Sequence, residues 1–183
     1  MRLIEKINDI DLRFFHALRT YSVSKTTDIL LRFYIYIGDG YIWVLFLVYF
    51  AVFDGIDKMV EIIKAILPAA ILSLIVYHII KLSIKRKRPY VLLPGVSTKI
   101  SPLDKYSFPS GHTMNNLTVS LGLIYFLQPI GTIAVILLIL MPLSWGVLRI
   151  YYGLHWLTDV LAGIVLAILC FWVGFVLLPS IIW

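Results

Sequence analysis

The sequence predicts an all-α integral membrane protein with about five transmembrane helices and an N-terminal amphipathic helix at the membrane interface. Hydrophobic residues make up 61% of the 183-residue chain and charged residues only 14%, whereas soluble domains carry roughly 25% charged residues. A soluble chain of this length cannot bury so much apolar surface, so the bilayer is the better solvent for it. The length suits a single domain over residues 1–183.

Residues 1–25 are predicted to form the interfacial helix. Apolar residues recur there at three- and four-residue steps and share one helical face, namely Leu3, Ile7, Ile10, Phe14 and Leu18. Charged residues between them prevent the segment from crossing the membrane, and these are Arg2, Glu5, Asp9, Arg13 and Arg19. A secretory signal is not expected, because the segment has no continuous apolar core and no small-residue cleavage site.

Five apolar stretches follow, each close to the roughly 20 residues that a helix needs to cross a bilayer. They cover about residues 29–53, 60–84, 110–128, 130–148 and 156–178. Alternating crossings bring the end of the second stretch, the start of the third and the junction of the fourth and fifth to one membrane face. The longest polar connection, residues 85–107, lies on that face, and we expect it to form a loop over a site there.

Residues suited to phosphate chemistry occur at those three places. They are Lys81 with Arg88 and Pro89, then Pro109 to His112, then Arg149 with His155 and Asp159. Lys81, Arg88 and Arg149 supply positive charge, which assists reaction of a phosphate ester by stabilising its oxygens. At the start of the third stretch, Ser110 offers a hydroxyl, and Gly111 allows close approach to the free backbone N–H groups of a helix start.

His155 and Asp159 are four residues apart and therefore face the same side of a helix. A carboxylate in this position holds one imidazole nitrogen protonated and leaves the other free to attack an electrophile. No metal site is expected, because the chain has one cysteine and no cluster of Cys and His residues.

Together, the three segments resemble the three motifs of the type 2 phosphatidic acid phosphatase superfamily, in the family's order and over roughly residues 60–175. The resemblance implies a phosphatase that needs no metal or cofactor. It also implies that His155 is the nucleophile of a phosphohistidine mechanism, that His112 is the general acid and base, and that Asp159 orients His155. Phosphate would be bound by Lys81, Arg88, Ser110, Gly111 and Arg149. One departure is Leu148, where the family often has serine.

Neighbouring residues have less specific roles. Three cations are expected to contact anionic lipid head groups, namely Lys85, Arg86 and Lys87. His78, one turn before Lys81, either lines the pocket or makes an interhelical hydrogen bond. Asp39, between two glycines, either pairs with a basic residue or contacts the head group.

The expected activity is removal of a phosphate or diphosphate from an anionic membrane lipid. Candidate substrates are lipid A 1-phosphate, phosphatidylglycerol phosphate and undecaprenyl diphosphate. The alternatives are transfer of the phosphoryl group to another lipid, hydrolysis of a soluble phosphate ester, and non-catalytic lipid binding or transport on the same scaffold. The expected partners are thus the membrane and its lipid, and not nucleic acid.

Two arguments disagree on membrane orientation. All but two of the 16 Lys and Arg residues lie on the face that carries the motifs, the exceptions being Lys58 and Lys64. The positive-inside rule therefore places this face in the cytoplasm. Similar bacterial enzymes act on the outer side, however, and an anionic substrate explains several of the cations. We therefore expect a multi-pass protein of the bacterial cytoplasmic (inner) membrane, with its site on the periplasmic or extracytoplasmic face.

Overall fold

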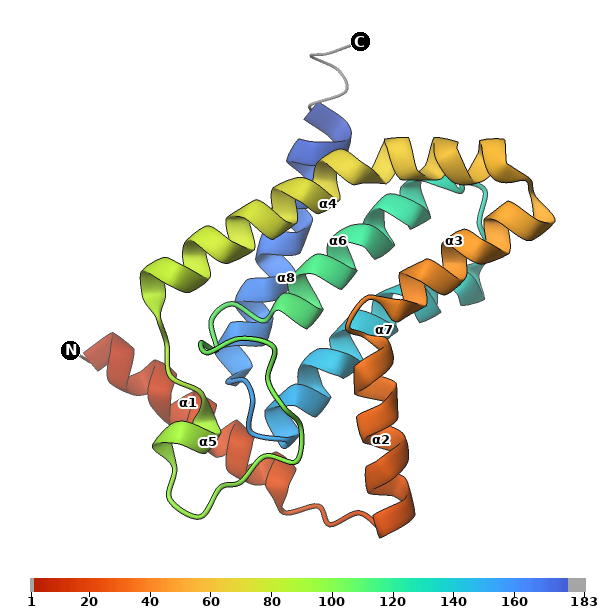
Figure 1. Ribbon diagram of the computed structural model, residues 1–183. Helices are drawn as coiled ribbons and strands as arrows, with labels where there is room; N and C mark the ends of the chain where they lie inside the picture. The colour runs from red at the N-terminus through yellow and green to blue at the C-terminus, as the bar shows by residue number, and fades with distance from the viewer. Residues whose placement is uncertain (1, 178–183) are drawn as a thin grey trace.

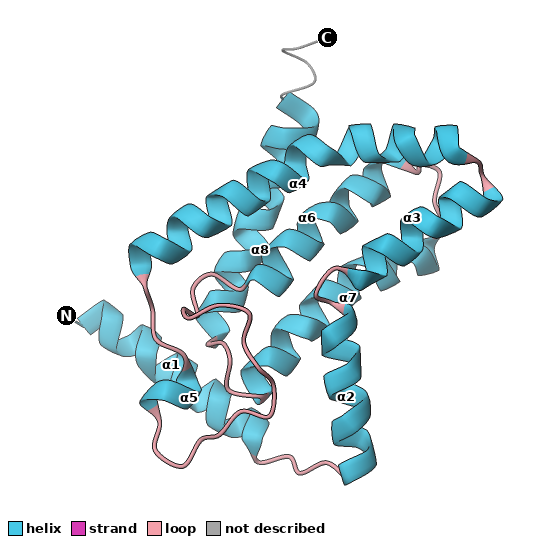
Figure 2. Cartoon of the chain, in the orientation of Figure 1, coloured by secondary structure: helices cyan, strands magenta, loops and turns pink. Residues whose placement is uncertain are grey.

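The computed structural model describes residues 2–177, and within this range the chain forms helices and no strand (Figures 1 and 2). The prediction of an all-helical protein is therefore confirmed. The helices are α1 (Arg2–Arg19), α2 (Lys25–Ile37), α3 (Tyr41–Phe53), α4 (Ile56–Ile84), α5 (Pro89–Leu92), α6 (Gly111–Phe126), α7 (Thr132–Tyr151) and α8 (Leu157–Phe171), which a π-helical segment η1 (Trp172–Leu177) extends.

Fewer helices than expected are long and apolar enough to cross a membrane. Three segments qualify in the described part of the chain: Ile56–Leu92, which runs from α4 through α5, Thr132–Tyr151, which is α7, and Leu157–Phe175, which is α8 with part of η1. The pair α2 and α3, whose axes differ by 64°, makes a fourth if the bent pair is counted as one span. The bend falls at Gly38, Asp39 and Gly40, where Gly40 has a φ of 113° that glycine adopts without strain. With 16 residues, α6 is too short to qualify, so the predicted count of five spans is not confirmed.

The short helix α6 lies at the centre of the bundle, where it packs against α4, α7 and α8 (Figure 1). It buries polar side chains that bond to its neighbours: Asn116 donates to the carbonyl of Gly38 at 2.9 Å, and Thr118 lies 3.3 Å from the Ser73 hydroxyl. The outer faces of α3, α4, α7 and α8 instead expose large apolar side chains. This arrangement suits a helix bundle in lipid. Lipid chains offer no hydrogen bonds, so buried polar groups must find their partners within the protein, while apolar side chains can face the lipid.

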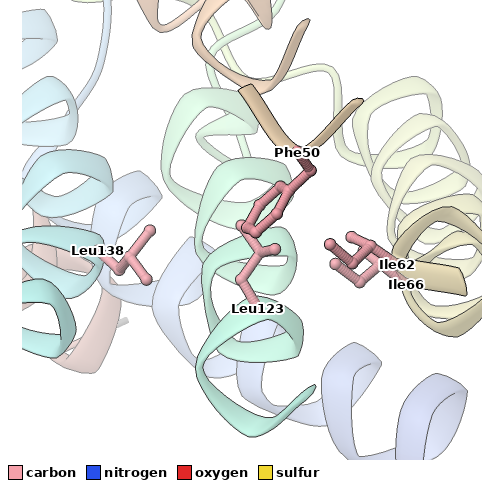
Figure 3. Close-up of a cluster of buried hydrophobic side chains, with 5 residues drawn as sticks. All are labelled: Phe50, Ile62, Ile66, Leu123 and Leu138. Carbon is pink, nitrogen blue, oxygen red and sulfur yellow. The ribbon is translucent and has the colours of Figure 1, made fainter. Parts of the chain in front are cut away.

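An apolar cluster fixes the far end of α6 (Figure 3). It joins four helices through the buried side chains of Phe50, Ile62, Ile66, Leu123 and Leu138. Leu123 lies in the last turn of α6, so this packing holds the helix at the end remote from Gly111. The polar first turn of α6 is thereby left to line a site.

The N-terminal helix α1 ends at Arg19, before the predicted limit of residue 25. It packs across the ends of α7 and α8, with Phe15 fully buried and Asp11 only 1% exposed. Ile10, from the predicted apolar face, remains 52% exposed. The buried face therefore overlaps the predicted one through Phe14 and Leu18 but is shifted toward Asp11 and Phe15. Its location in the membrane interface stays a prediction.

Candidate active site

A cavity of about 580 Å³ lies between α3, α4, α6 and the loop that follows α5. All three sequence segments contribute to its lining, through Lys81, Gly111, His112, Arg149 and His155. Figure 1 shows why: the end of α4, the start of α6 and the α7–α8 junction lie at the same end of the bundle. Four residues of the predicted loop also line it, namely Leu103, Asp104, Lys105 and Tyr106.

The three predicted phosphate-binding cations Lys81, Arg88 and Arg149 are all buried. Lys81 and Arg88 do not lie on one continuous helix, because α4 ends at Ile84 and the chain turns at Lys85, whose φ is 52°. Arg88 instead precedes the short helix α5 and donates to the carbonyl of Leu154 at 2.7 Å. This bond ties the second cation to the connection that carries His155.

Asp104, which the sequence did not single out, joins two of these cations. Its Oδ2 accepts hydrogen bonds from Lys81 Nζ at 2.8 Å and from the Tyr77 hydroxyl at 2.6 Å, and its Oδ1 accepts one from Arg88 Nη2 at 2.8 Å. Burial raises the pKa of the Asp104 carboxyl, but the hydrogen bonds from Lys81 and Tyr77 outweigh it and hold the pKa well below its ordinary value. A charged carboxylate therefore lies between Lys81 and Arg88.

Each of the two buried guanidinium groups keeps a donor unused. Within residues 2–177, Nε of Arg88 and Nε of Arg149 have no hydrogen-bond partner. Buried donors without partners are rare and costly, and the free Nε of Arg149, which lines the cavity, points to a ligand. Planar Arg donors suit an anion with several oxygens, such as a phosphate group.

His155 lies in the connection between α7 and α8, which leaves α7 through Gly153 with a φ of 76°. Its side chain is only 2% exposed, and its Nδ1 lies 3.6 Å from Asp159 Oδ2, too far for a direct hydrogen bond. Burial lowers the pKa of His155 well below its ordinary value, and the charges of Arg88 and Arg149 lower it further. The imidazole is therefore neutral near pH 7 and keeps one nitrogen with a free lone pair.

His112, the second residue of α6, meets both a cation and a carboxylate. Its Nε2 lies 2.7 Å from Arg149 Nη1 and 2.6 Å from Asp39 Oδ1. Asp39 sits at the bend between α2 and α3 and also lines the cavity. Because one imidazole nitrogen either donates or accepts, the tautomer of His112 determines whether it bonds to Asp39 or to Arg149. Asp39 thus lies beside basic residues, one of the two roles left open for it, while its contact with a head group stays a prediction.

Ser110 and Gly111 open α6 differently from expectation. The Ser110 hydroxyl is buried and lies 3.1 Å from that of Thr113, while its backbone N–H donates to the Asp159 carbonyl at 3.0 Å. A Cβ on Gly111 would lie 2.7 Å from the Tyr77 ring. The close approach that requires glycine is therefore that of α4, and phosphate contact by Ser110 stays a prediction.

The remaining candidates, His78 and the three cations at residues 85–87, lie in three different environments. His78 lines the cavity, but its Nδ1 lies 2.8 Å from the carbonyl of Leu74 on its own helix, so the bond is intrahelical. Lys85 and Lys87 are exposed. Arg86 does not face solvent with them, because its guanidinium forms ion pairs with carboxylates of α1 and α8. This inward orientation disagrees with the head-group contact expected for Arg86.

Residues 63–183 match the family model of the PAP2 superfamily. The chain belongs to this superfamily. The match confirms the family that the three sequence segments indicate, and it begins after α3, so α1 to α3 lie outside the matched PAP2 region.

Two solved structures resemble the chain. The crystal structure of Aquifex aeolicus LpxE has a TM-score of 0.74 and 26% sequence identity, covering 90% of this chain and 93% of that chain. The first transmembrane PAP2 type phosphatidylglycerolphosphate phosphatase from Bacillus subtilis has a TM-score of 0.69 and 19% identity, covering 92% of this chain and 84% of that chain. The second likeness shows the fold alone. With the apolar helices, the PAP2 match identifies a multi-pass membrane protein and supports a phosphatase.

Proposed function

We propose that this PAP2 protein is a lipid phosphatase in which His155 attacks phosphorus and forms a phosphohistidine intermediate. The observation that carries the proposal is the convergence of His155, His112 and Arg149 on one cavity, with two further buried cations beside them. A neutral imidazole among buried cations is suited to attack an anion, because the cations attract the substrate and keep the nucleophile unprotonated.

The first step transfers the phosphoryl group to His155. The nitrogen that faces away from Asp159 forms the new P–N bond, while the bond between phosphorus and the lipid oxygen breaks. His112 gives its proton to the departing oxygen. The Asp39 carboxylate and the negative charge of the bound phosphate favour the protonated form, against burial and the Arg149 charge, which favour the neutral imidazole. The Asp159 carboxylate stabilises the positive charge that develops on the phosphorylated ring.

In the second step, a water molecule attacks the phosphohistidine. His112, now neutral, takes a proton from that water, the P–N bond breaks, and inorganic phosphate leaves with His155 restored. Lys81, Arg88 and Arg149 stabilise the equatorial oxygens in both steps, and the proposed mechanism therefore uses no metal ion or cofactor. When phosphate binds, the Asp104 carboxylate must move partly away from Lys81 and Arg88, because two anions between these cations repel each other.

An apolar cavity of about 170 Å³ supports a lipid substrate. It lies between α3, α4 and α6 and shares three lining residues with the active-site cavity, namely Trp43, Ala70 and Val119. A hydrocarbon chain in this cavity would leave the phosphorylated head group beside His155, an arrangement that a soluble phosphate ester does not need. The candidates remain lipid A 1-phosphate, phosphatidylglycerol phosphate and undecaprenyl diphosphate.

We place the active site on the extracytoplasmic face of a bacterial inner membrane. Single cysteines at residues 56 and 99 test this orientation in a variant without Cys170, which is buried. An impermeant thiol reagent should label residue 99 and spare residue 56 in whole cells. Labelling of residue 56 alone would reverse the orientation.

The activity test measures phosphate release from purified protein with the three candidate lipids and p-nitrophenyl phosphate, with and without a lipid acceptor. We expect release from at least one lipid, and loss of that release in both His155→Ala and His112→Ala. Phosphate appearing on the acceptor would identify a phosphotransferase. Absence of both products from the wild type, or full activity in His155→Ala, would contradict the proposal and favour a non-catalytic lipid-binding protein.

A further inference from the structure

Arg86 lies between Lys81 and Arg88 in sequence, yet its guanidinium forms ion pairs away from the active-site cavity, which Lys81 lines. Its Nη1 donates to Asp159 Oδ1 and to the Thr158 hydroxyl, both at 2.7 Å. Its Nη2 donates to Asp11 Oδ2 at 2.6 Å. Arg86 thus bridges carboxylates from two helices that are far apart in the sequence, α1 and α8.

Asp11 fastens α1 to the first turn of α8. Its Oδ1 accepts from the Thr158 backbone N–H at 2.9 Å, and its Oδ2 accepts from the Thr158 hydroxyl at 2.7 Å. The first N–H groups of a helix have no partner within the helix, and a carboxylate there is favourable. A residue of α1 therefore caps the helix turn that carries Asp159.

The Asp159 side chain is fully buried and is held by two donors on different oxygens. Arg86 binds Oδ1, and the backbone N–H of Trp156 donates to Oδ2 at 2.8 Å. Oδ2 is also the oxygen that lies 3.6 Å from His155 Nδ1. A buried carboxylate requires a counter-ion to stay charged, and Arg86 supplies that charge without touching the cavity.

We propose that Asp11 and Arg86 are positioning residues for His155, acting through Asp159. Arg86 keeps the Asp159 carboxylate charged and fixes its plane, and Asp11 holds Arg86 in place. The inference rests on the proposed function, in which His155 attacks phosphorus. It makes α1, which lies outside the matched PAP2 region, part of the catalytic apparatus.

A head-group contact is the competing role for Arg86, and kinetics separates the two. A residue that binds the head group changes KM and leaves kcat nearly unchanged, whereas a residue that positions the nucleophile changes kcat. The pH profile gives a second distinction, because a buried carboxylate that has lost its counter-ion takes up a proton more readily. The titratable and charged groups around Asp159 and His155 are Asp11, Arg86, Lys81, Arg88, His112 and Arg149.

The test compares Arg86→Gln, Arg86→Lys and Asp11→Asn in purified protein, with phosphatidylglycerol phosphate in mixed micelles and p-nitrophenyl phosphate as substrates. We expect Arg86→Gln to lower kcat by about 10- to 100-fold, as is typical when a partner that orients a reactive group is lost. Its KM should change by less than about twofold. Arg86→Lys keeps the charge and should recover part of kcat, and Asp11→Asn should lower kcat about 3- to 10-fold. The acid limb of the kcat profile should move to higher pH in Arg86→Gln but not in Arg86→Lys.

The matched control is Asp9→Asn, which removes an exposed carboxylate from the same helix. Asp9 pairs with Arg13 at 2.8 Å on the surface, so this variant should keep wild-type kinetics. Unfolding temperatures in detergent are measured for every variant.

The outcomes are distinguishable. If His155→Ala keeps wild-type activity, the proposed function itself fails. If His155→Ala is inactive while Arg86→Gln and Asp11→Asn keep wild-type kcat and pH profiles, the positioning role is wrong and the phosphatase stands. A rise of KM alone, or a loss of kcat that follows the loss of folded protein with no change in pH profile, also overturns the positioning role.

Discussion

The first turn of α6 is surrounded by buried charge, whereas its last turn is surrounded by apolar side chains. Around His112 lie Asp39 and Arg149, and around Leu123 lie Phe50 and Ile66. Buried charges are costly even when paired, whereas close apolar packing stabilises a helix bundle in lipid. The difference indicates that the second end holds the bundle together while the first end is kept for chemistry.

Apart from the two histidines, the largest expected effect at the charged end comes from Arg149→Lys. Lysine keeps the positive charge but loses the planar fork and the bond to His112. We expect kcat to fall by roughly 10²- to 10³-fold, the range found when one donor to a developing oxyanion is removed. Lys58→Gln is the matched control, because Lys58 lies in the first turn of α4, outside the active-site cavity, and pairs with Glu61. An equal fall of kcat in Arg149→Lys and Lys58→Gln would contradict the functional difference between the two ends of α6.

Asp39→Asn tests whether Asp39, at the bend between α2 and α3, assists His112 at the same end of α6. The amide keeps the shape but loses the charge that favours protonated His112. We expect kcat to fall about 10-fold for a lipid with a poor leaving group, within the range of general acid catalysis. A substrate with a good leaving group, such as p-nitrophenyl phosphate, needs less protonation and should show a smaller loss. An equal loss for both substrates would argue against this role for Asp39.

Asp104→Asn tests whether the carboxylate between Lys81 and Arg88 competes with the substrate. Its removal frees two cations for an external anion, so inorganic phosphate should inhibit the variant at about 3- to 10-fold lower concentration than the wild type. The inhibition constant is measured at fixed substrate and ionic strength. Weaker inhibition in the variant would show that Asp104 organises the cations rather than competing with the substrate.

The smallest effect on turnover is expected for Leu123→Ala, and its comparison with His155→Asn, which removes the nucleophile, gives a contrast in the pH dependence of stability. Burial lowers the pKa of His155 in the folded protein, so the unfolded chain binds its proton more readily. The stability linked to His155 is therefore full above about pH 6.5 and is lost as pH falls below it toward the folded-state pKa. His155→Asn should flatten the fall of Tm between pH 7 and pH 5.

Leu123→Ala should instead lower Tm by a similar amount at each pH, because it removes packing without a titrating group. In soluble cores such a change costs roughly 2–5 kcal/mol. Leu123 also lines the apolar cavity, so turnover is compared with p-nitrophenyl phosphate, which has no chain to place there, and kcat of the folded fraction should stay near that of the wild type. A Tm loss in Leu123→Ala that depends on pH would contradict the division between the two ends.

Much of the charged end was predictable from the sequence. Lys81, His112 and His155 occur where apolar stretches end, and charged residues in such places usually line a functional cavity. Alternation of the stretches then brings these ends to one membrane face. The residues of the three segments therefore come together even though the predicted number of five spans is not confirmed.

The length of α6 and its central place were not predictable in the same way. Hydropathy reports that residues 110–128 are apolar, but it does not report whether a helix faces lipid or other helices. Asn116 and Thr118 find partners on neighbouring helices, so a 16-residue helix is stable inside the bundle. Packing against neighbouring helices thus determines the length and central position of α6, which the apolar pattern alone does not specify.

Asp11 and Asp104 could not be identified because acidic residues in polar segments usually face solvent. Asp11 lies 75 residues from Arg86 in the sequence, and Asp104 lies 16 residues from Arg88. Neither pairing has a sequence signature, since it depends on how α1 and the loop after α5 fold over the bundle. The only signal was the excess of cations on this face, which requires carboxylates or a ligand to balance it.

Trapping the phosphoryl-enzyme tests the central claim most directly. Purified protein is mixed with ³²P-labelled phosphatidylglycerol phosphate, quenched within milliseconds, and digested to locate the label. We expect label that is stable to base and labile to acid on His155, and none in His155→Ala. Label on another residue, or phosphate release from His155→Ala at the wild-type rate, would contradict nucleophilic attack by His155.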